Sequence, residues 1–523
     1  MSCSSRSAAT RRGRTRPTEN VMRPREFAVR GSCKASICAV AFTVVSALCA
    51  CNGPLKLDHP PAMPAGFEQQ QNAAEANAQQ SIDETRLVNW WTQFDDPALN
   101  ALIERALKNN YDLRLAAARV DDARSNILAA RSALLPSVGV GVEAAKYHGG
   151  ETQLEFAQFL GVNDLDAQFW RVGLQTQWEI DVFGRGRARL AAARAMTLAA
   201  AGDAQAARLA VVATVADAYM TYRGLIVQRR LIEQSRAIAE DFVVIAQHSF
   251  VAGVVLSTDI DAARAALAQI QAREQEVDRA LVSARLSIEQ ICAAQPGELA
   301  SVLDETTELP QALPAIAPGQ PVDLLERRPD LIAARDRLFA AKRQSDVARL
   351  NYWPTFSLSA VLARNGWEIA GQSLGPSTLW LFGAAAMMPL IDFGARESRV
   401  QATDAQARAA ELAYEKAAQG ALFDVEQALA RLSRQAQLRD VRTNEVAQRR
   451  TILRKTQTQL RVGEVGRMDL DRAQLALVDS EAALVREQVG ELSAQIALFR
   501  AMGGGWERTG TPLALSPSAG AIW

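Results

Sequence analysis

The chain repeats a long part of its own sequence, and this duplication constrains its fold more than any other feature. The segment WEIDVFGRGR at 178–187 returns as MPLIDFGARES at 388–398. At the same interval, VAGVVLSTDIDAARAAL at 251–267 returns as RVGEVGRMDLDRAQLAL at 461–477. Duplications of this kind build one structural body from two similar units. We therefore expect two related halves of one body, an internal two-fold repeat, in place of two unrelated domains.

Each half contains two segments in which apolar and polar residues alternate, as they do in β-strands. Val138, Val140 and Val142 alternate with glycine and glutamate, and the run from Trp170 to Trp178 has one apolar and one polar face. The predicted strands, each about 10 residues long, lie at about 136–147, 167–182, 354–365 and 378–392. The apolar face would meet a protein core in a soluble sandwich, or lipid in an outer-membrane barrel. The strand length is that expected of a tilted transmembrane strand.

Long helices are predicted for most of the remaining sequence. The stretches 184–286 and 394–501 consist mainly of Ala, Leu, Arg, Gln and Glu, a composition typical of long packed helices. An uninterrupted helix over 186–250 would be about 100 Å long. Gly253 and Gly463 are predicted to end the two longest helices by adopting a left-handed conformation. The sequence therefore predicts a mixed α and β membrane protein.

Four strands in one chain create a problem at the edges of the sheet. Four strands cannot close a membrane barrel, and open strand edges are not tolerated in lipid. Three copies would supply twelve antiparallel strands, an even number within the known range. We therefore expect a homotrimer with a twelve-stranded β-barrel in membrane lipid, continued by a long α-helical coiled-coil barrel.

The start of the chain has the pattern of an export signal. Basic residues from Arg23 to Lys34 precede an apolar stretch at 35–51, which is shorter than a typical transmembrane helix. The stretch ends in LCAC at 48–51, which resembles a bacterial lipobox, so Cys51 is the predicted lipid attachment site. An ordinary signal peptide that contains cysteines is the alternative.

The remaining boundaries follow from composition. The segment after the predicted anchor is rich in Pro, Gln, Asn and Ala, which favours an extended tether. The predicted parts are a signal peptide with an extra N-terminal segment at 1–50, a lipid-anchored tether at 51–89, the first repeat at 90–309, the second repeat at 310–506 and a C-terminal tail at 507–523. Met22 is an alternative start of the chain, and Asn52 is compatible with an outer-membrane destination.

Charge and motifs argue against several classes of function. The first 50 residues hold nine basic and two acidic residues, so the 58 basic and 58 acidic residues of the whole chain leave an acidic excess in the remainder. A mildly acidic body is a poor nucleic-acid binder, because phosphate contacts need a basic surface. The three histidines are widely separated, and no GxSxG motif or glycine-rich phosphate loop occurs. We expect no enzyme activity, no metal and no cofactor.

Five phrases in a fixed order carry a resemblance to a known family. They are WWTQFDDPALNALIERALKNNYDLRLAAARV at 90–120, WEIDVFGRGR at 178–187, ERRPDLIAAR at 326–335, MPLIDFGARES at 388–398 and LFRAMGGGW at 498–506. Together they resemble the outer-membrane factor family, which is TolC-like, and within it the NodT-type efflux lipoproteins. The resemblance extends from Trp90 to about Trp506.

The resemblance implies a homotrimer, lipid-anchored in the outer membrane of a Gram-negative bacterium, that extends into the periplasm. It implies a passive exit duct that docks on a periplasmic adaptor protein and an inner-membrane pump of the RND type and exports small molecules. A duct for type I protein secretion is the alternative within transport. A periplasmic coiled-coil scaffold lipoprotein that forms no channel is the alternative from another class.

The turn after Gly463 is the predicted periplasmic gate. By the register of the family motif, Met468, Asp469 and Arg472 correspond to constricting side chains. A threefold axis brings three copies of a side chain together, and such a ring can close a pore. Asp469 and Arg472 also have the i, i+3 spacing of a bridge on one helix face. The alternative is that these are ordinary residues of a helix start, with Asp469 as the N-cap.

The equivalent turn of the first copy and the strand ends supply further candidates. Thr258, Asp259 and Asp261 are predicted to contact the adjacent helix or the adaptor, or else to be ordinary residues of a helix start. Four residues are interpreted as structural elements of the junction between barrel and helices, namely Pro136, Gly184, Pro354 and Gly394.

Overall fold

The computed structural model describes residues 61–71, 87–149, 165–304, 308–313, 319–369 and 371–506 of the 523-residue chain. All of these residues belong to the unit formed by residues 57–523. The predicted signal peptide, Cys51, most of the predicted tether and the predicted C-terminal tail lie outside the described residues.

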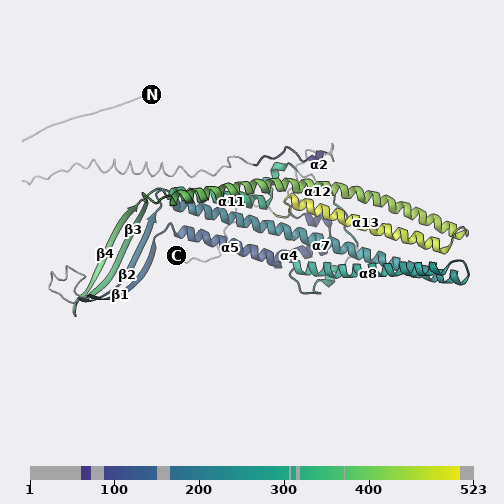
Figure 1. Ribbon diagram of the computed structural model, residues 1–523, viewed down its shortest axis with the longest axis horizontal. Helices are drawn as coiled ribbons and strands as arrows, with labels where there is room; N and C mark the ends of the chain where they lie inside the picture. Colours follow the sequence, from purple (N-terminus) through teal and green to yellow (C-terminus); the bar gives the residue numbers. More distant parts are fainter. Residues whose placement is uncertain are drawn as a thin grey trace, which may run out of the picture. The chain divides into compact units, whose positions relative to one another are not determined.

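The strands form one antiparallel sheet in the order β1-β2-β3-β4 (Figure 1). Their bounds are β1 Ser137–Gly149, β2 Leu165–Ile180, β3 Thr355–Ile369 and β4 Gln372–Met387. The central pair, β2 with β3, joins parts of the chain that are far apart in sequence, with Gly173 opposite Ala363. The four antiparallel strands predicted from alternation are thus confirmed.

The strands contain 13, 16, 15 and 16 residues, more than the general length of about 10 that was expected. Against the predicted bounds, β2 has the same length as 167–182, β3 extends beyond 365, and β4 is displaced. The prediction began β4 after Pro376, but Pro376 lies inside the strand opposite Gly366, where the register shifts. A proline is tolerated at such an irregularity of a sheet edge. The predicted end at 392 was also wrong, since Pro389 lacks the N–H that would continue the ladder.

One face of the sheet presents an exposed apolar row. Val140 lies opposite Leu174, Leu174 opposite Leu362, and Leu362 opposite Trp380. All four side chains are exposed, Val140 to 73% and Trp380 to 70%. The other face carries polar contacts, such as the Arg171–Glu143 ion pair of 2.5 Å. A large exposed apolar patch marks a surface that meets lipid or another protein.

The helices come in pairs of equal length. Before β1 lie α2 Glu68–Gln71, η2 Trp90–Phe94, α4 Pro97–Asn109 and α5 Tyr111–Ser132. Between β2 and β3 lie α7 Arg185–Val251, α8 Ser257–Ile291, α9 Ala300–Asp304, η3 Pro321–Asp323, α10 Leu324–Arg327 and α11 Pro329–Leu350. After β4 come α12 Ala395–Arg461 and α13 Arg467–Ala501. Helices α7 and α12 each contain 67 residues, and α8 and α13 each contain 35. At 1.5 Å per residue, α7 and α12 are each about 100 Å long.

Helix α7 forms the centre of the helical part, because it packs against α4, α5, α8, α11 and α13. It is also the one helix of the described chain that is long and apolar enough to cross a membrane. Its apolar side chains, among them Val215, Tyr219 and Met220, are buried in the main hydrophobic core. In the same core the Trp90 ring stacks on Phe499, with ring centres 4.9 Å apart. Helix packing within the chain therefore accounts for part of the apolar character of α7, since 39% of its most apolar window is buried.

Candidate functional site

Two helical turns, seen in Figure 1 at the ends of α7 and α12 away from the sheet, are the candidate site. We call residues 249–261 the first tip and residues 459–472 the second tip. Gly253 and Gly463 adopt left-handed φ angles of 76° and 80°. The next N–H groups donate back to the helix, from Val254 to Ser249 O at 2.8 Å and from Glu464 to Gln459 O at 2.9 Å. A side chain is disfavoured in this conformation, so glycine allows the sharp turn.

At the second tip, the three predicted gate residues lie in the first two turns of α13. Met468 is half-buried, whereas Asp469 and Arg472 are exposed. Arg472 Nη1 lies 3.3 Å from Asp469 Oδ1, so the i, i+3 bridge is present. The alternative that Asp469 is the N-cap is wrong, because the helix begins after Gly466. Asp469 instead accepts a 3.0 Å hydrogen bond from the Gly466 N–H, which caps the helix from within its first turn.

The structure adds a cluster that sequence reasoning missed. The Arg467 guanidinium lies 3.1 Å from Asp241 of α7 and 3.1 Å from Asp471 of α13. One turn on, the Arg472 guanidinium lies 5.7 Å from the centre of the Phe242 ring. The start of α13 is thus tied to the end of α7 by an ion pair and a cation–π contact. The i, i+4 spacing of Arg467 and Asp471 was the only local signal, since Asp241 lies 226 residues earlier.

Asp471 is the most unusual member of this cluster. Its side chain is 0% exposed, and neither carboxylate oxygen receives a well-aligned hydrogen bond. Burial raises the pKa of the Asp471 carboxyl, the positive charge of Arg467 opposes this rise, and the negative charge of Asp241 adds to it. Since Arg467 is shared by two carboxylates, the cluster carries an excess of negative charge when both are ionised.

At the first tip, the predicted residues interact within their own hairpin. Asp259 Oδ2 accepts a 2.9 Å hydrogen bond from the Leu256 N–H, and Asp261 lies 3.9 Å from Arg264. Thr258 is exposed. No ion pair with another helix of the described chain is seen for either carboxylate. Contact of Thr258, Asp259 and Asp261 with the adjacent helix or the adaptor stays a prediction. The first tip therefore lacks a counterpart of the Arg467–Asp241 ion pair.

The predicted junction residues lie between the sheet and the helices. Pro136 and Pro354 directly precede β1 and β3. Gly184 and Gly394 are the N-caps of α7 and α12, with left-handed φ angles of 86° and 94°.

Two aspartates of the repeated motif hold these junctions, although sequence reasoning did not single them out. Asp181 accepts from the Arg187 N–H at 2.8 Å, and Asp392 accepts from the Arg396 N–H at 3.1 Å and from its Nε at 2.5 Å. Both carboxylates cap the first turn of a 67-residue helix. Asp181 lies two residues before Phe183-Gly184, and Asp392 lies directly before Phe393-Gly394. An aspartate just ahead of the Phe-Gly pair in both copies was the available signal.

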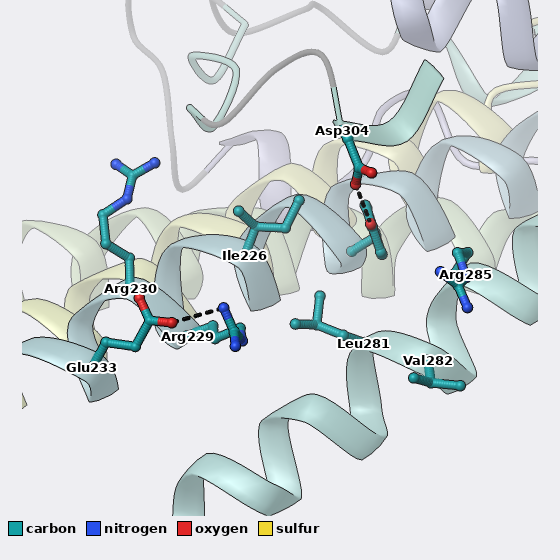
Figure 2. Close-up of a pocket in the computed structure, with 9 residues that line it drawn as sticks. Ile226, Arg229, Arg230, Glu233, Leu281, Val282, Arg285 and Asp304 are labelled. Atoms are coloured by element: carbon teal, nitrogen blue, oxygen red, sulfur yellow. Dashed lines mark hydrogen bonds and ion pairs between the residues drawn. The ribbon is translucent and has the colours of Figure 1, made fainter. Parts of the chain in front are cut away.

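A groove with a volume of about 380 Å³ lies between α7, α8 and α9 (Figure 2). Its lining residues are Tyr222, Ile226, Arg229, Arg230, Glu233, Leu281, Val282, Arg285 and Asp304. Arg229 pairs with Glu233 at 2.7 Å and with Asp278 at 2.6 Å. The lining therefore carries three arginines and two carboxylates, Glu233 and Asp304, and both ion pairs are made by Arg229.

Groups that could perform covalent or metal chemistry are sparse. In the described part of the chain, no three His, Cys, Asp or Glu side chains gather as a metal site. The Cys292 thiol is buried against Leu102 O, at 3.6 Å, and burial raises its pKa to about 11. A thiol with this pKa is a weak nucleophile at neutral pH.

Comparison with known proteins gives the family. The family model described as outer membrane efflux protein matches residues 102–294 and 321–504. The toluene efflux pump outer membrane protein TtgC of Pseudomonas putida is 26% identical over 434 residues, which cover 82% of this chain and 88% of TtgC. OprJ, an outer membrane protein of Pseudomonas aeruginosa, is 28% identical over 429 residues, which cover 80% and 87%. The solved outer-membrane channel OprN is 27% identical and superposes with a TM-score of 0.75, covering 86% of this chain and 99% of OprN. The chain belongs to the outer membrane efflux protein family, and it is an outer-membrane channel for efflux.

Proposed function

We propose that three copies of this chain form a passive duct through the outer membrane, which serves as the exit of a tripartite efflux pump. The observation that carries this proposal is the sheet. In the described chain, β1 pairs only with β2 and β4 only with β3, so each has a free edge. The row from Val140 to Trp380 is apolar and exposed. Lipid tolerates apolar faces but not free edges, and pairing β4 of one copy with β1 of the next removes the edges.

The helices support a conduit that continues the barrel. Helices α7 and α12 are the elements that follow β2 and β4, across the short segments 181–184 and 388–394, and are each about 100 Å long. Three pairs of such helices would enclose a tunnel in the periplasm. The equal lengths of α7 and α12, and of α8 and α13, support the view that two repeats contribute alike to this tunnel.

The tips are proposed to meet the rest of the pump. We assign the second tip, with Met468, Asp469 and Arg472, to the entrance of the tunnel. We assign the first tip, with Thr258, Asp259 and Asp261, to contact with a periplasmic adaptor that links the duct to an inner-membrane pump of the RND type. The relatives support this assignment because TtgC is named as the outer membrane protein of a toluene efflux pump. Small molecules are the proposed cargo.

The N-terminal sequence supports attachment to lipid. We propose that residues 1–50 are removed as a signal peptide, that Cys51 is acylated, and that residues 51–89 tether the channel to the outer membrane. The lipobox-like LCAC at 48–51 is the basis of this part of the proposal.

Single-channel recording tests the proposal. The purified full-length protein should form trimers by cross-linking and should conduct ions in planar lipid bilayers. A monomeric protein that conducts at no voltage would instead favour a coiled-coil scaffold. Co-purification of the adaptor and pump distinguishes efflux from type I secretion, since only the latter brings an ABC-type protein exporter as the partner.

A further inference from the structure

The second tip contains a buried carboxyl group that the proposed duct does not otherwise use. Asp471 points between α13 and α7, is 0% exposed, and has no well-aligned hydrogen-bond donor for either oxygen. An ionised carboxylate in this position is disfavoured unless it is fully paired. Because this burial arises within one chain, assembly with further copies cannot expose Asp471.

Within the described ranges, Arg467 is the one positive charge paired with Asp471, and it is shared with a second carboxylate. Arg467 Nε lies 3.1 Å from Asp471 Oδ1, and Arg467 Nη2 lies 3.1 Å from Asp241 Oδ2. Arg467 is about half exposed, so water screens part of its charge. A single guanidinium therefore serves two carboxylates, one on α13 and one on α7.

The other charged side chains at this end of α7, α8 and α13 either pair with other partners or form no ion pair with Asp471. On α7, Arg236 lies 3.8 Å from Glu240 and 3.6 Å from Glu274 of α8. On α13, Arg472 pairs with Asp469. The remaining charged or titratable residues of the neighbouring helix ends form no ion pair with Asp471, and they are Asp259, Asp261, Arg264, Arg454, Lys455, Arg461, Glu464 and His248. The balance at Asp471 therefore depends on Arg467 and Asp241.

We propose that Asp471 is a proton-responsive element of the second tip, and that protonation of its carboxyl tightens the packing of α13 on α7 and favours a closed entrance as the pH falls. This inference rests on the proposed role of the second tip as the entrance of the duct. When α13 separates from α7, Asp471 reaches water and loses the burial that penalises its charge. The packed state thus binds the proton more tightly than the separated state.

The sign of the pH effect follows from this linkage. The pKa of Asp471 in the packed state is raised above the ordinary value of 3.8, chiefly by burial. Packing is therefore favoured most below the ordinary value, and this preference is lost as the pH rises through the raised pKa. For each unit by which the two pKa values differ, the preference changes about tenfold.

Hydrogen exchange of the purified full-length protein tests the proton response directly. The probe is the amide protection of residues 465–475 between about pH 4 and about pH 7, relative to peptides from α4, which correct for the intrinsic pH dependence of exchange. Protection of the wild-type tip should rise as the pH falls. In Asp471→Asn it should be high and independent of pH, because the amide does not ionise.

Two further variants keep the test decisive if Asp471→Asn folds poorly. Arg467→Gln removes the shared cation and should move the midpoint of the transition to higher pH. Asp241→Asn leaves Arg467 to Asp471 alone and should move the midpoint to lower pH. His248→Gln, which removes the histidine near this end of α7, should leave the midpoint unchanged. Midpoints that do not respond to Asp471, Arg467 and Asp241, or protection that falls with acid, would overturn the inference.

Bilayer recordings separate this inference from the function on which it rests. The open probability of the wild-type channel should decrease as the pH falls, and Asp471→Asn should abolish this dependence. A channel that conducts with the same pH dependence in both proteins overturns the inference and leaves the duct intact. A protein that never conducts contradicts the duct, while hydrogen exchange still decides whether Asp471 responds to protons.

Discussion

Arg439 of α12 and Glu491 of α13 form an enclosed ion pair, in which Arg439 Nη1 lies 2.7 and 2.8 Å from the two carboxylate oxygens of a side chain that is 6% exposed. The pair joins the two helices of the second hairpin at a level closer to the C-terminal end of α13 than to the second tip. Because Glu491 is buried, its charge depends on this partner.

Removing the cation of this pair should destabilise the second hairpin. Arg439→Gln leaves Glu491 buried without its counter-charge, at a cost of about 2 to 3 kcal/mol. Arg450→Gln is the matched control. Arg450 and Glu481 lie 2.8 Å apart and join the same two helices at an exposed position. This exposed ion pair should contribute less than about 1 kcal/mol to the free energy of unfolding. Thermal unfolding followed by circular dichroism measures both. Equal losses in the two variants would contradict the role of burial.

The central strand pair should be intolerant of a methyl group at Gly173. A Cβ there would lie 2.6 Å from Ala363 Cα, so β2 and β3 would have to move apart. We expect Gly173→Ala to cost about 2 kcal/mol and to reduce the heat resistance of the proposed trimer on gels. Gly139→Ala is the control, because a Cβ at Gly139 meets nothing within 4 Å in the described chain. A wild-type melting point for Gly173→Ala would contradict the close approach.

A buried network ties α7 to the start of α4. Tyr219 donates its hydroxyl to Asp96 Oδ2 at 2.8 Å, and Arg223 Nη1 donates to the same carboxylate oxygen at 3.2 Å. Tyr219→Phe should cost about 1 to 2 kcal/mol, because one acceptor position of buried Asp96 is left unfilled. Tyr222→Phe should change the stability by less than about 0.5 kcal/mol, since its hydroxyl lies 3.4 Å from Asp304. Chemical denaturation compares the two, and the reverse order of losses would refute this assignment.

The junction between β4 and α12 should loosen in acid. The hydrogen bond from Arg396 is the main cause of the lowered pKa of Asp392. Asp392 therefore stabilises the first turn of α12 fully above the ordinary value of 3.8, and this contribution is lost as the pH falls through the lowered pKa. Hydrogen exchange at residues 394–400 should reveal the loss in wild type and a constant, lower protection in Asp392→Asn. Asp261→Asn, at the distant first tip, serves as the control and should behave as wild type.

Much of the architecture could be predicted from local patterns. Alternation around Val140 and Leu174 predicted strands, and the unbroken helical composition predicted α7 almost to the residue. These predictions succeeded because side-chain periodicity is a property of the segment itself. The limits of β4 were wrong because Pro376 is a breaker in most sequences, and only the irregular pairing with Gly366 accommodates it here.

The residues of the candidate site also fall into two groups, those that could be predicted from the sequence and those that could not. Gly253 and Gly463 were recognisable, since a left-handed turn needs glycine whatever surrounds it. Asp471 and Asp241 were not, because a carboxylate in an Ala- and Arg-rich helix is usually solvated, and its burial depends on which helix lies beside it.

By itself, the sequence determined the repeated order of elements, the two glycine tips and the membership of the family, because each of these is encoded in local spacing or in motifs. Only the tertiary structure decided the register of β2 against β3, the ion pair between Arg439 and Glu491, and the sharing of Arg467 between Asp241 and Asp471. Those contacts join residues far apart in the chain, and their energies depend on burial and distance, which exist only once the helices and strands are packed.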